Sequence, residues 1–315
     1  MSWWNSYWFC PAPLLDLAIL RIVAVGLQLW LMLYHYNLME FLHECTSLPD
    51  NLYTPLLILK LLLSPFGWGY RPSLEVLIVL YWATVVAGIL ALIGLRTNVS
   101  LVVFAVGSLT LTAFGYSFGK VHHPDAVMMI ALSVLALSPS GQVLSVDAWR
   151  RRHLNSPTSQ KSNLSEVLYV ENTFARWPML LIQWFFVLMY ISAFISKMAE
   201  SGTEWMNGYT LQYILIADGM RWDNPLALWA SQYHLFLKLL QWVIVIFQAT
   251  FWVAVIWPLA RWIYIPLGLS FHIGILLTLG ADFYPWIALY VVFIPWAHFF
   301  KGLLQQFRPA AEKIA

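Results

Sequence analysis

The sequence predicts an all-α integral membrane protein, a bundle of about eight transmembrane helices with one extra interfacial helix. Of its 315 residues, 61% are hydrophobic and only 10% are charged, and the mean hydropathy is +0.70. A soluble globular domain carries about 25% charged residues, so this chain lacks the polar side chains that a water-facing surface needs. The apolar residues also form several long runs, which excludes a soluble protein with a single membrane anchor.

The positions of the expected spans follow from these runs, because a helix needs about 20 mostly apolar residues to cross the hydrocarbon core. The fourth run is short, and we expect it to be tilted or re-entrant. Together the runs are expected to form one transmembrane domain over residues 1–315. The eight predicted spans cover residues 14–34, 74–95, 98–118, 125–140, 177–199, 236–257, 262–280 and 283–300.

Two further segments are predicted to lie at the membrane surface. The aromatic N-terminus, with Trp3, Trp4 and Tyr7, is typical of an amphipathic lead-in at the level of the lipid headgroups. Segment 53–64 is too short to span, and Lys60 interrupts its apolar run. We therefore interpret it as the interfacial helix.

The basic residues predict the orientation, since cytoplasmic loops carry an excess of lysine and arginine. A cytoplasmic N-terminus places Arg96, the arginine run that starts at Arg150, and Arg261 on the inside. It also makes the loop near 145–176 and a short tail at 301–315 cytoplasmic. The prediction is a multi-pass protein of the cytoplasmic membrane with both termini inside. Membrane lipid is the expected partner, and a net charge of +2 is too small to indicate nucleic acid.

Lys197 is the first candidate for chemistry, because it lies near the outer end of the fifth predicted span. Burial of a lysine favours its neutral form, which makes it a base at neutral pH. The alternative is a lysine that extends its amine to the membrane surface and pairs with Glu200, three residues on. Both interpretations stay open from position alone.

His272 is the second candidate, since it lies within the seventh predicted span with no charged neighbour in sequence. A histidine in such a place is usually hydrogen-bonded inside the helix bundle, which is the structural alternative. Its predicted depth matches that of Lys197, so both side chains are expected to face one cavity that opens outward. Second-rank candidates for this cavity are His122, His123, Asp125, Glu200, Trp205, Tyr209 and Asp282.

The pair His122 and His123 lies with Asp125 in the loop between the third and fourth spans, which raises the question of a metal site. A metal site needs three or four converging ligands, and nothing in the sequence shows that Asp282 joins this group. We predict no metal. Arg21, inside the first span, is expected to face the bundle and to have a partner there, in a structural or a functional role.

Five stretches of the chain together resemble the vitamin K-dependent gamma-carboxylase family. More specifically, they are similar to its bacterial branch, the horizontally transferred transmembrane (HTTM) domain proteins. The resemblance covers most of the chain, in order. The stretches are LAILRIV at 17–23, LIGLRTNVS at 92–100, LALSPSGQVLSVDAWRRR at 135–152, YISAFISKMAESGTEWMNGY at 190–209 and SFHIGILLTLGADFYPW at 270–286.

The resemblance implies an oxygen-driven reaction with a reduced naphthoquinone of the menaquinone or vitamin K type as cofactor. In the carboxylase a lysine deprotonates the quinol, and the strong base formed with oxygen removes a γ-proton from a glutamyl side chain, which then takes up CO2. That lysine corresponds to Lys197, and a histidine of the family corresponds to His272. The family histidine that assists carboxylation corresponds to Gln142, so the quinol-activating half is implied more directly than the CO2 half.

The leading functional prediction is therefore a quinol- or lipid-linked, carboxylase-like enzyme that modifies a peptide or small substrate from the outer face. Lys197 is the expected base and His272 its orienting or charge-stabilising partner. One alternative is a non-enzymatic membrane factor for the maturation or export of a secreted peptide. Another is an accessory subunit of a larger membrane complex.

Overall fold

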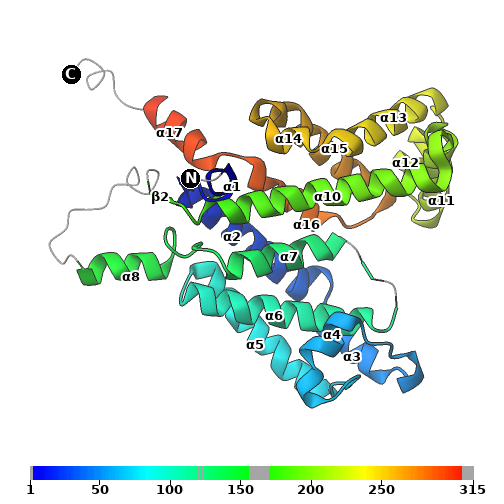
Figure 1. Cartoon of the computed structure of the whole chain (residues 1–315). Coiled ribbons are helices and arrows are strands. Elements are labelled where there is room, and N and C mark those ends of the chain that lie inside the picture. Colours follow the sequence, from blue (N-terminus) through cyan, green and yellow to red (C-terminus); the bar gives the residue numbers. More distant parts are fainter. Residues whose placement is uncertain (1–2, 120, 123, 156–169, 307–315) are drawn as a thin grey trace. The chain divides into compact units, whose positions relative to one another are not determined.

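The fold is described by a computed structural model that covers residues 3–119, 121–122, 124–155 and 170–306, and these residues are almost wholly helical (Figure 1). Two short strands, β1 (Ala12–Pro13) and β2 (Glu171–Asn172), pair antiparallel with Ala12 opposite Asn172. The all-α class is confirmed. The chain divides into two compact units, unit 1 with Met1–Met179 and Ile294–Ala315, and unit 2 with Leu180–Phe293.

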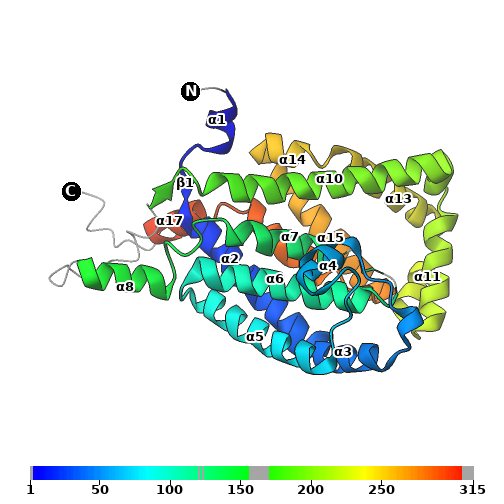
Figure 2. The same ribbon diagram turned by 60° about the horizontal axis from the view of Figure 1, so that its bottom comes forward.

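Unit 1 contains the N-terminal helices and the last helix of the chain. Figures 1 and 2 both show α5 and α6 side by side as an antiparallel pair, and α2 and α7 pack against this pair. Its helices are α1 (Trp3–Trp8), α2 (Leu14–Trp30), the π-helix η1 (Leu31–His35), α3 (Leu38–Ser47), η2 (Asp50–Leu52), α4 (Leu57–Leu62), η3 (Ser64–Phe66), α5 (Leu74–Ile93), α6 (Thr97–Tyr116), α7 (Pro124–Ala136), α8 (Val146–Asn155) and α17 (Trp296–Gln306).

Unit 2 begins within the long helix α10 (Arg176–Ser201), and α11 turns away from the end of that helix (Figure 2). Helices α11, α13 and α14 pack against α15. After α10 the elements are η4 (Gly202–Met206), α11 (Tyr209–Arg221), α12 (Pro225–Ala230), α13 (His234–Thr250), α14 (Val253–Ile256), η5 (Pro258–Ala260), α15 (Arg261–Leu279), α16 (Tyr284–Leu289) and η6 (Tyr290–Phe293).

Several helices are long and apolar enough to cross a membrane, and they also expose apolar side chains such as Val79, Leu188 and Trp262. A helix that is apolar on its outer face as well as its inner face fits lipid rather than water. The chain is thus a multi-pass membrane protein. In the described residues there are five such segments, or six if the bent pair Tyr284–Phe293 and Trp296–Leu303 is one span: Leu14–His35, Leu74–Ile93, Thr97–Tyr116, Arg176–Met206 and Pro258–Leu279.

The predicted count of eight spans is not confirmed, because two of the expected spans are short helices. The run at 125–140 forms α7, of 13 residues, and the run at 236–257 forms α13, of 17 residues, followed by the separate helix α14. A helix of 13 residues rises about 20 Å, less than the roughly 30 Å of the hydrocarbon core. The region near 145–176 was expected to be a loop, but it contains α8, and residues 156–169 lie outside the described part of the chain.

The joint between α5, α6 and α8 is held by one carboxylate. Asp147 accepts hydrogen bonds from the backbone N–H of Arg96 (2.9 Å), the backbone N–H of Thr97 (2.8 Å) and the Thr97 hydroxyl (2.8 Å). The two N–H groups belong to the N-cap and the first residue of α6, where backbone N–H groups have no partner within the helix. A negative charge at this end of a helix is also favourable. Asp147 therefore caps α6 from a position 50 residues further along the chain.

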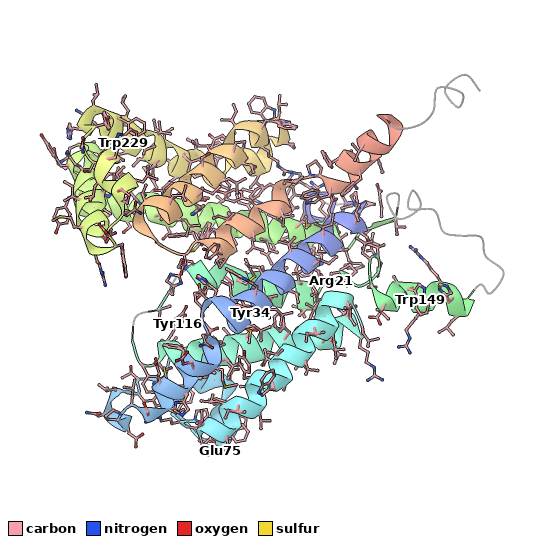
Figure 3. All side chains as sticks on the ribbon, turned by 180° about the vertical axis from the view of Figure 1, so that it is seen from behind. Arg21, Tyr34, Glu75, Tyr116, Trp149 and Trp229 are labelled. Carbon is pink, nitrogen blue, oxygen red and sulfur yellow. The ribbon has the colours of Figure 1, made fainter. Side chains whose placement is uncertain are left out.

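Arg21, on α2, extends its side chain to the same joint; Figure 3 labels this residue. Its side chain is fully buried, and Nη2 donates to the backbone oxygen of Leu144 at 2.6 Å. Asp147 is near enough to attract the guanidinium, and Ser145 caps α8 by accepting from the N–H of Ala148 at 2.9 Å. The expectation that Arg21 faces the bundle and has a partner is confirmed. We call Arg21, Arg96–Thr97 and Leu144–Asp147 the Asp147 corner.

Replacing Asp147 by alanine is predicted to destabilise the protein, because it leaves the first N–H groups of α6 without an acceptor. The free energy of unfolding should fall by about 1–2 kcal/mol, the usual cost of losing a helix cap. Thermal unfolding in detergent measures this. Asp147→Asn, which keeps an oxygen acceptor, is expected to lose less. Equal losses from both variants would mean that charge alone matters at this joint.

The Asp147 corner is also predicted to weaken in acid. Burial raises the pKa of Asp147, but hydrogen bonds from Thr97 and Arg96 and the charge of Arg151 outweigh it, so this pKa lies below its ordinary value. An aspartate titrates near pH 3.9 when unfolded, so the stabilisation is complete above that pH and is lost as pH falls through the lower folded pKa. The stability difference between wild type and Asp147→Asn should therefore shrink in acid. A difference that grows in acid would contradict the assignment.

Candidate functional site

The candidate site of unit 2 is built around the hydroxyl of Tyr190, on α10. This oxygen lies 2.7 Å from Nε2 of His272, on α15, and 2.6 Å from the hydroxyl of Tyr290, in η6. All three side chains are buried, and His272 is only 2% exposed. The network therefore joins three separate elements through polar atoms that water does not reach. The structural expectation for His272, a hydrogen bond inside the bundle, is confirmed.

Aromatic rings surround this network. The Trp286 ring centroid lies 5.3 Å from the ring centroids of both Tyr190 and His272, and that of Phe283 lies 5.0 Å from His272. Gly268 makes room for Tyr290, since a Cβ at this glycine would collide with the tyrosine hydroxyl. In such apolar surroundings a hydrogen bond is electrostatically stronger than in water, and an unpaired polar atom costs more.

Two nitrogen atoms beside the network have no hydrogen-bond partner among the described residues. They are Nδ1 of His272 and Nε1 of Trp286, and the Trp286 side chain is 4% exposed. If Tyr190 donates to Nε2 of His272, the imidazole carries its proton on Nδ1. Both orphaned atoms are then donors. One of these donors belongs to an imidazole and the other to an indole, and the two ring centroids lie 5.3 Å apart.

Lys197 lies on the same face of α10 as Tyr190, because seven residues make about two turns, or roughly 10 Å along the axis. Its Nζ donates to the backbone oxygen of Ala193 (3.2 Å) and lies 5.0 Å from the ring centroid of Trp205. The side chain is half-buried. Glu200, the alternative partner, is near enough to attract the ammonium, but its exposed carboxylate accepts a hydrogen bond from Ser196 at 3.0 Å.

The residues after Lys197 form a structural corner. Gly208 has φ of +96°, a conformation that favours glycine, and a Cβ there would come within 2.7 Å of the His234 ring. The exposed Tyr209 ring lies 4.3 Å from the His234 ring. The backbone oxygen of Trp205 accepts from Gln241 at 2.6 Å. The Trp-x-x-Gly-Tyr pattern is thus explained by packing, apart from the indole ring that faces Lys197.

The second-rank candidates of the outer loop form a separate polar cluster in unit 1. Asp125 is buried and accepts from the hydroxyls of Tyr36 (3.2 Å) and Tyr116, and Nδ1 of His122 lies 3.5 Å from it. His123 lies outside the described residues. Among the described residues no group of three or more histidine, cysteine or acidic side chains is arranged to hold a metal.

Asp282 and Gln142 lie in different units. Asp282 is partly buried in the segment between α15 and α16 of unit 2. Gln142, in unit 1, is exposed, and its Oε1 accepts from Asn172 at 3.0 Å, next to the β1–β2 pair. Gln142 therefore has a structural contact of its own.

Sequence reasoning did not single out Tyr190, Tyr290 and Trp286. The sequence could have identified Tyr190 as a site residue, since it lies seven residues before Lys197 and so shares its helix face. Tyr290 and Trp286 lie in a part of the chain that is rich in aromatic residues, and no sequence pattern distinguishes them. Comparison of the chain with models of protein families, with curated proteins and with solved structures returned no match.

Tyr190→Phe is predicted to destabilise the protein more than Tyr290→Phe. Loss of the central hydroxyl leaves both Nε2 of His272 and the Tyr290 hydroxyl unpaired, and a buried unpaired polar atom costs about 1–3 kcal/mol. Loss of the terminal hydroxyl breaks one bond and leaves Tyr190 bonded to His272. Thermal unfolding in detergent compares the two variants.

Tyr264→Phe is the matched control, because the Tyr264 hydroxyl bonds only at the edge of the same unit, to Thr250 at 2.8 Å. It should cost less than either network variant. If Tyr190→Phe behaves like Tyr264→Phe, the three side chains do not form a coupled network.

Proposed function

We propose that this protein is a quinol- or lipid-linked membrane enzyme of the carboxylase-like, HTTM type, with Lys197 as its base. The observation that carries the proposal is the buried Tyr190–His272–Tyr290 network. It lies beside two unpaired nitrogen atoms and on the α10 face that also bears Lys197. Buried unpaired polar atoms are costly, and here two of them belong to side chains whose ring centroids lie 5.3 Å apart. A pair of donors of this kind offers a place where a ligand oxygen can bind.

A reduced naphthoquinone fits the chemistry of these side chains. It is a flat aromatic ring with one oxygen at each end, and the network is walled by aromatic rings such as Phe283 and Trp286. Nδ1 of His272 and Nε1 of Trp286 would hold one of its oxygens. When bound, the quinol supplies two reducing equivalents and a weakly acidic hydroxyl.

The role of Lys197 is to take up the proton of that hydroxyl. An amine in apolar surroundings loses its own proton more readily than in water, while the face of an aromatic ring attracts the ammonium form. Lys197 experiences both influences, since it is half-buried and lies over Trp205. A lysine balanced in this way can accept and release a proton. His272, held by Tyr190, would orient the substrate oxygen or stabilise its charge.

The proposal covers the quinol half of the family reaction. The carboxylation half has less support, because Gln142 is bonded to Asn172. The acceptor would be a peptide or small substrate that reaches the site from the outer face. We also propose a bundle of eight spans in the bacterial cytoplasmic membrane with both termini inside. The arginines of α8 support this orientation.

A second candidate function is non-enzymatic: a membrane factor for the maturation or export of a secreted peptide, or an accessory subunit of a membrane complex. One observation favours it. Much of what resembles the carboxylase family has a structural role here, such as Asp147 at the start of α6 and Gly208 against His234.

Lys197→Met is predicted to abolish quinone epoxide formation if the enzyme proposal is correct. The purified protein is given reduced menaquinone and oxygen, and the epoxide is measured by chromatography. General-base catalysis contributes about 10²–10⁴-fold. The rate of epoxide formation by the variant should therefore fall by a factor in this range or more. The matched control is Lys238→Met, which removes an exposed lysine of the same unit and should keep full activity.

Two outcomes would contradict the enzyme proposal. If the wild type forms no epoxide, the quinol assignment fails and the non-enzymatic function is favoured. If Lys197→Met forms as much epoxide as the wild type, the lysine is not the base. Thermal unfolding of both variants shows whether a loss of activity reflects a loss of fold.

A further inference from the structure

The lipid-facing side of unit 1 has an apolar groove that ends at two arginines. The groove lies along α5 and α6, which run side by side in Figures 1 and 2, and has a volume of about 640 Å³. Both helices are long and apolar enough to span a membrane. Its walls include Trp82, Val86 and Leu90 of α5 and Val99 and Val103 of α6.

These wall residues are spaced to form a continuous channel along the helix pair. Trp82, Val86 and Leu90 follow one another at intervals of four residues, as do Val99 and Val103, so each set lies on one helix face. Trp82 is 54% exposed and Val99 is 63% exposed. The groove therefore runs for about 12 Å as an apolar surface open to the membrane.

The arginines at its end are Arg96, in the turn before α6, and Arg150, on α8. Both are exposed, and neither guanidinium donates a hydrogen bond to another described residue. Two other arginines of unit 1 are used differently, since Arg21 donates to Leu144 and Arg151 to Gly141. Arg96 and Arg150 thus present free positive charge beside an apolar channel.

The backbone holds Arg96 in this place at some cost. Its φ is +46°, in the left-handed region that a side chain with a Cβ adopts only with strain. Asp147 accepts from its N–H and so fixes the turn. Glycine or asparagine would adopt this conformation more easily. An arginine kept in a strained turn points to a use for its side chain.

The depth of the arginines follows from their neighbour Trp149. This tryptophan is exposed on α8, where Figure 3 labels it. Exposed tryptophan in membrane proteins gathers at the level of the lipid headgroups. Arg150 is next to it in sequence, so we expect the guanidinium groups at the level of the lipid phosphates, with the groove extending from them into the hydrocarbon.

We propose that this groove is a binding site for one anionic phospholipid. An acyl chain lies between α5 and α6, and Arg96 and Arg150 hold the headgroup phosphate. Arginine pairs well with phosphate because its planar fork donates two parallel hydrogen bonds. A free phosphate ion would use the arginines alone and would leave the channel without an occupant. The headgroup of a zwitterionic lipid would place its own positive charge beside the two arginines, which is unfavourable.

The test measures lipid binding to the full-length protein by native mass spectrometry from detergent, with dioleoyl phosphatidylglycerol and dioleoyl phosphatidylcholine as probes. The wild type is expected to retain the anionic lipid preferentially. A basic residue near the membrane surface contributes about 1 kcal/mol, which is roughly fivefold in affinity. Arg96→Gln with Arg150→Gln should therefore weaken phosphatidylglycerol binding on the order of 30-fold and leave phosphatidylcholine unchanged. Arg152→Gln, on the same helix but outside the groove, is the control for net charge.

A second pair of variants tests the acyl channel. Val86→Trp places a large side chain in the groove from an exposed position and should weaken binding, whereas Val79→Trp, exposed on the same helix but not lining the groove, should not. Unfolding temperatures confirm that the variants fold.

Three results would overturn the proposal. The first is equal retention of the two lipids by the wild type, and the second is an unchanged preference after loss of both arginines. The third is displacement of the lipid by excess inorganic phosphate together with no effect of Val86→Trp, which would mean that the arginines bind phosphate without a lipid chain.

Discussion

The structure depends on one constraint, that a polar atom inside an apolar helix bundle must find a partner. The hydroxyl of Tyr190 shows this in unit 2, since it holds His272 on α15 and Tyr290 in η6 to the same helix. No water is available in such a place, so these bonds are short, buried and mutually dependent. The aromatic rings around them fill space, but the hydrogen bonds decide which rings lie together.

In unit 1 the same constraint acts through charge. Arg21 is fully buried, and Leu144 and Asp147 reach it across more than a hundred residues of sequence. Asp147 also caps α6, so the corner joins the first span, the α5–α6 turn and α8. Two nitrogen atoms of the Arg21 guanidinium group, Nε and Nη1, have no partner among the described residues. The burial of this charge is therefore only partly offset by its partners.

The stretches that resemble the carboxylase family therefore have different kinds of explanation. The pieces around Arg21, Arg96 and Asp147 meet in one corner and are explained by helix capping and the burial of charge. The pieces around Lys197 and His272 lie in unit 2, beside polar atoms that have no partner there. Helix capping and the burial of charge thus account for the first set, whereas the second set includes two members of the Tyr190–His272–Tyr290 network.

Most span positions, the burial of Arg21 and the hydrogen bonding of His272 followed from the sequence, because apolar length and the cost of a buried charge are local properties. The sequence by itself thus determined the membrane class and the approximate course of the long helices. The tertiary structure alone decided that Gln142 bonds Asn172 and that the Tyr190 hydroxyl bonds both His272 and Tyr290. These outcomes depend on which helices pack together, and no local pattern of residues records the partner of a side chain a hundred residues away.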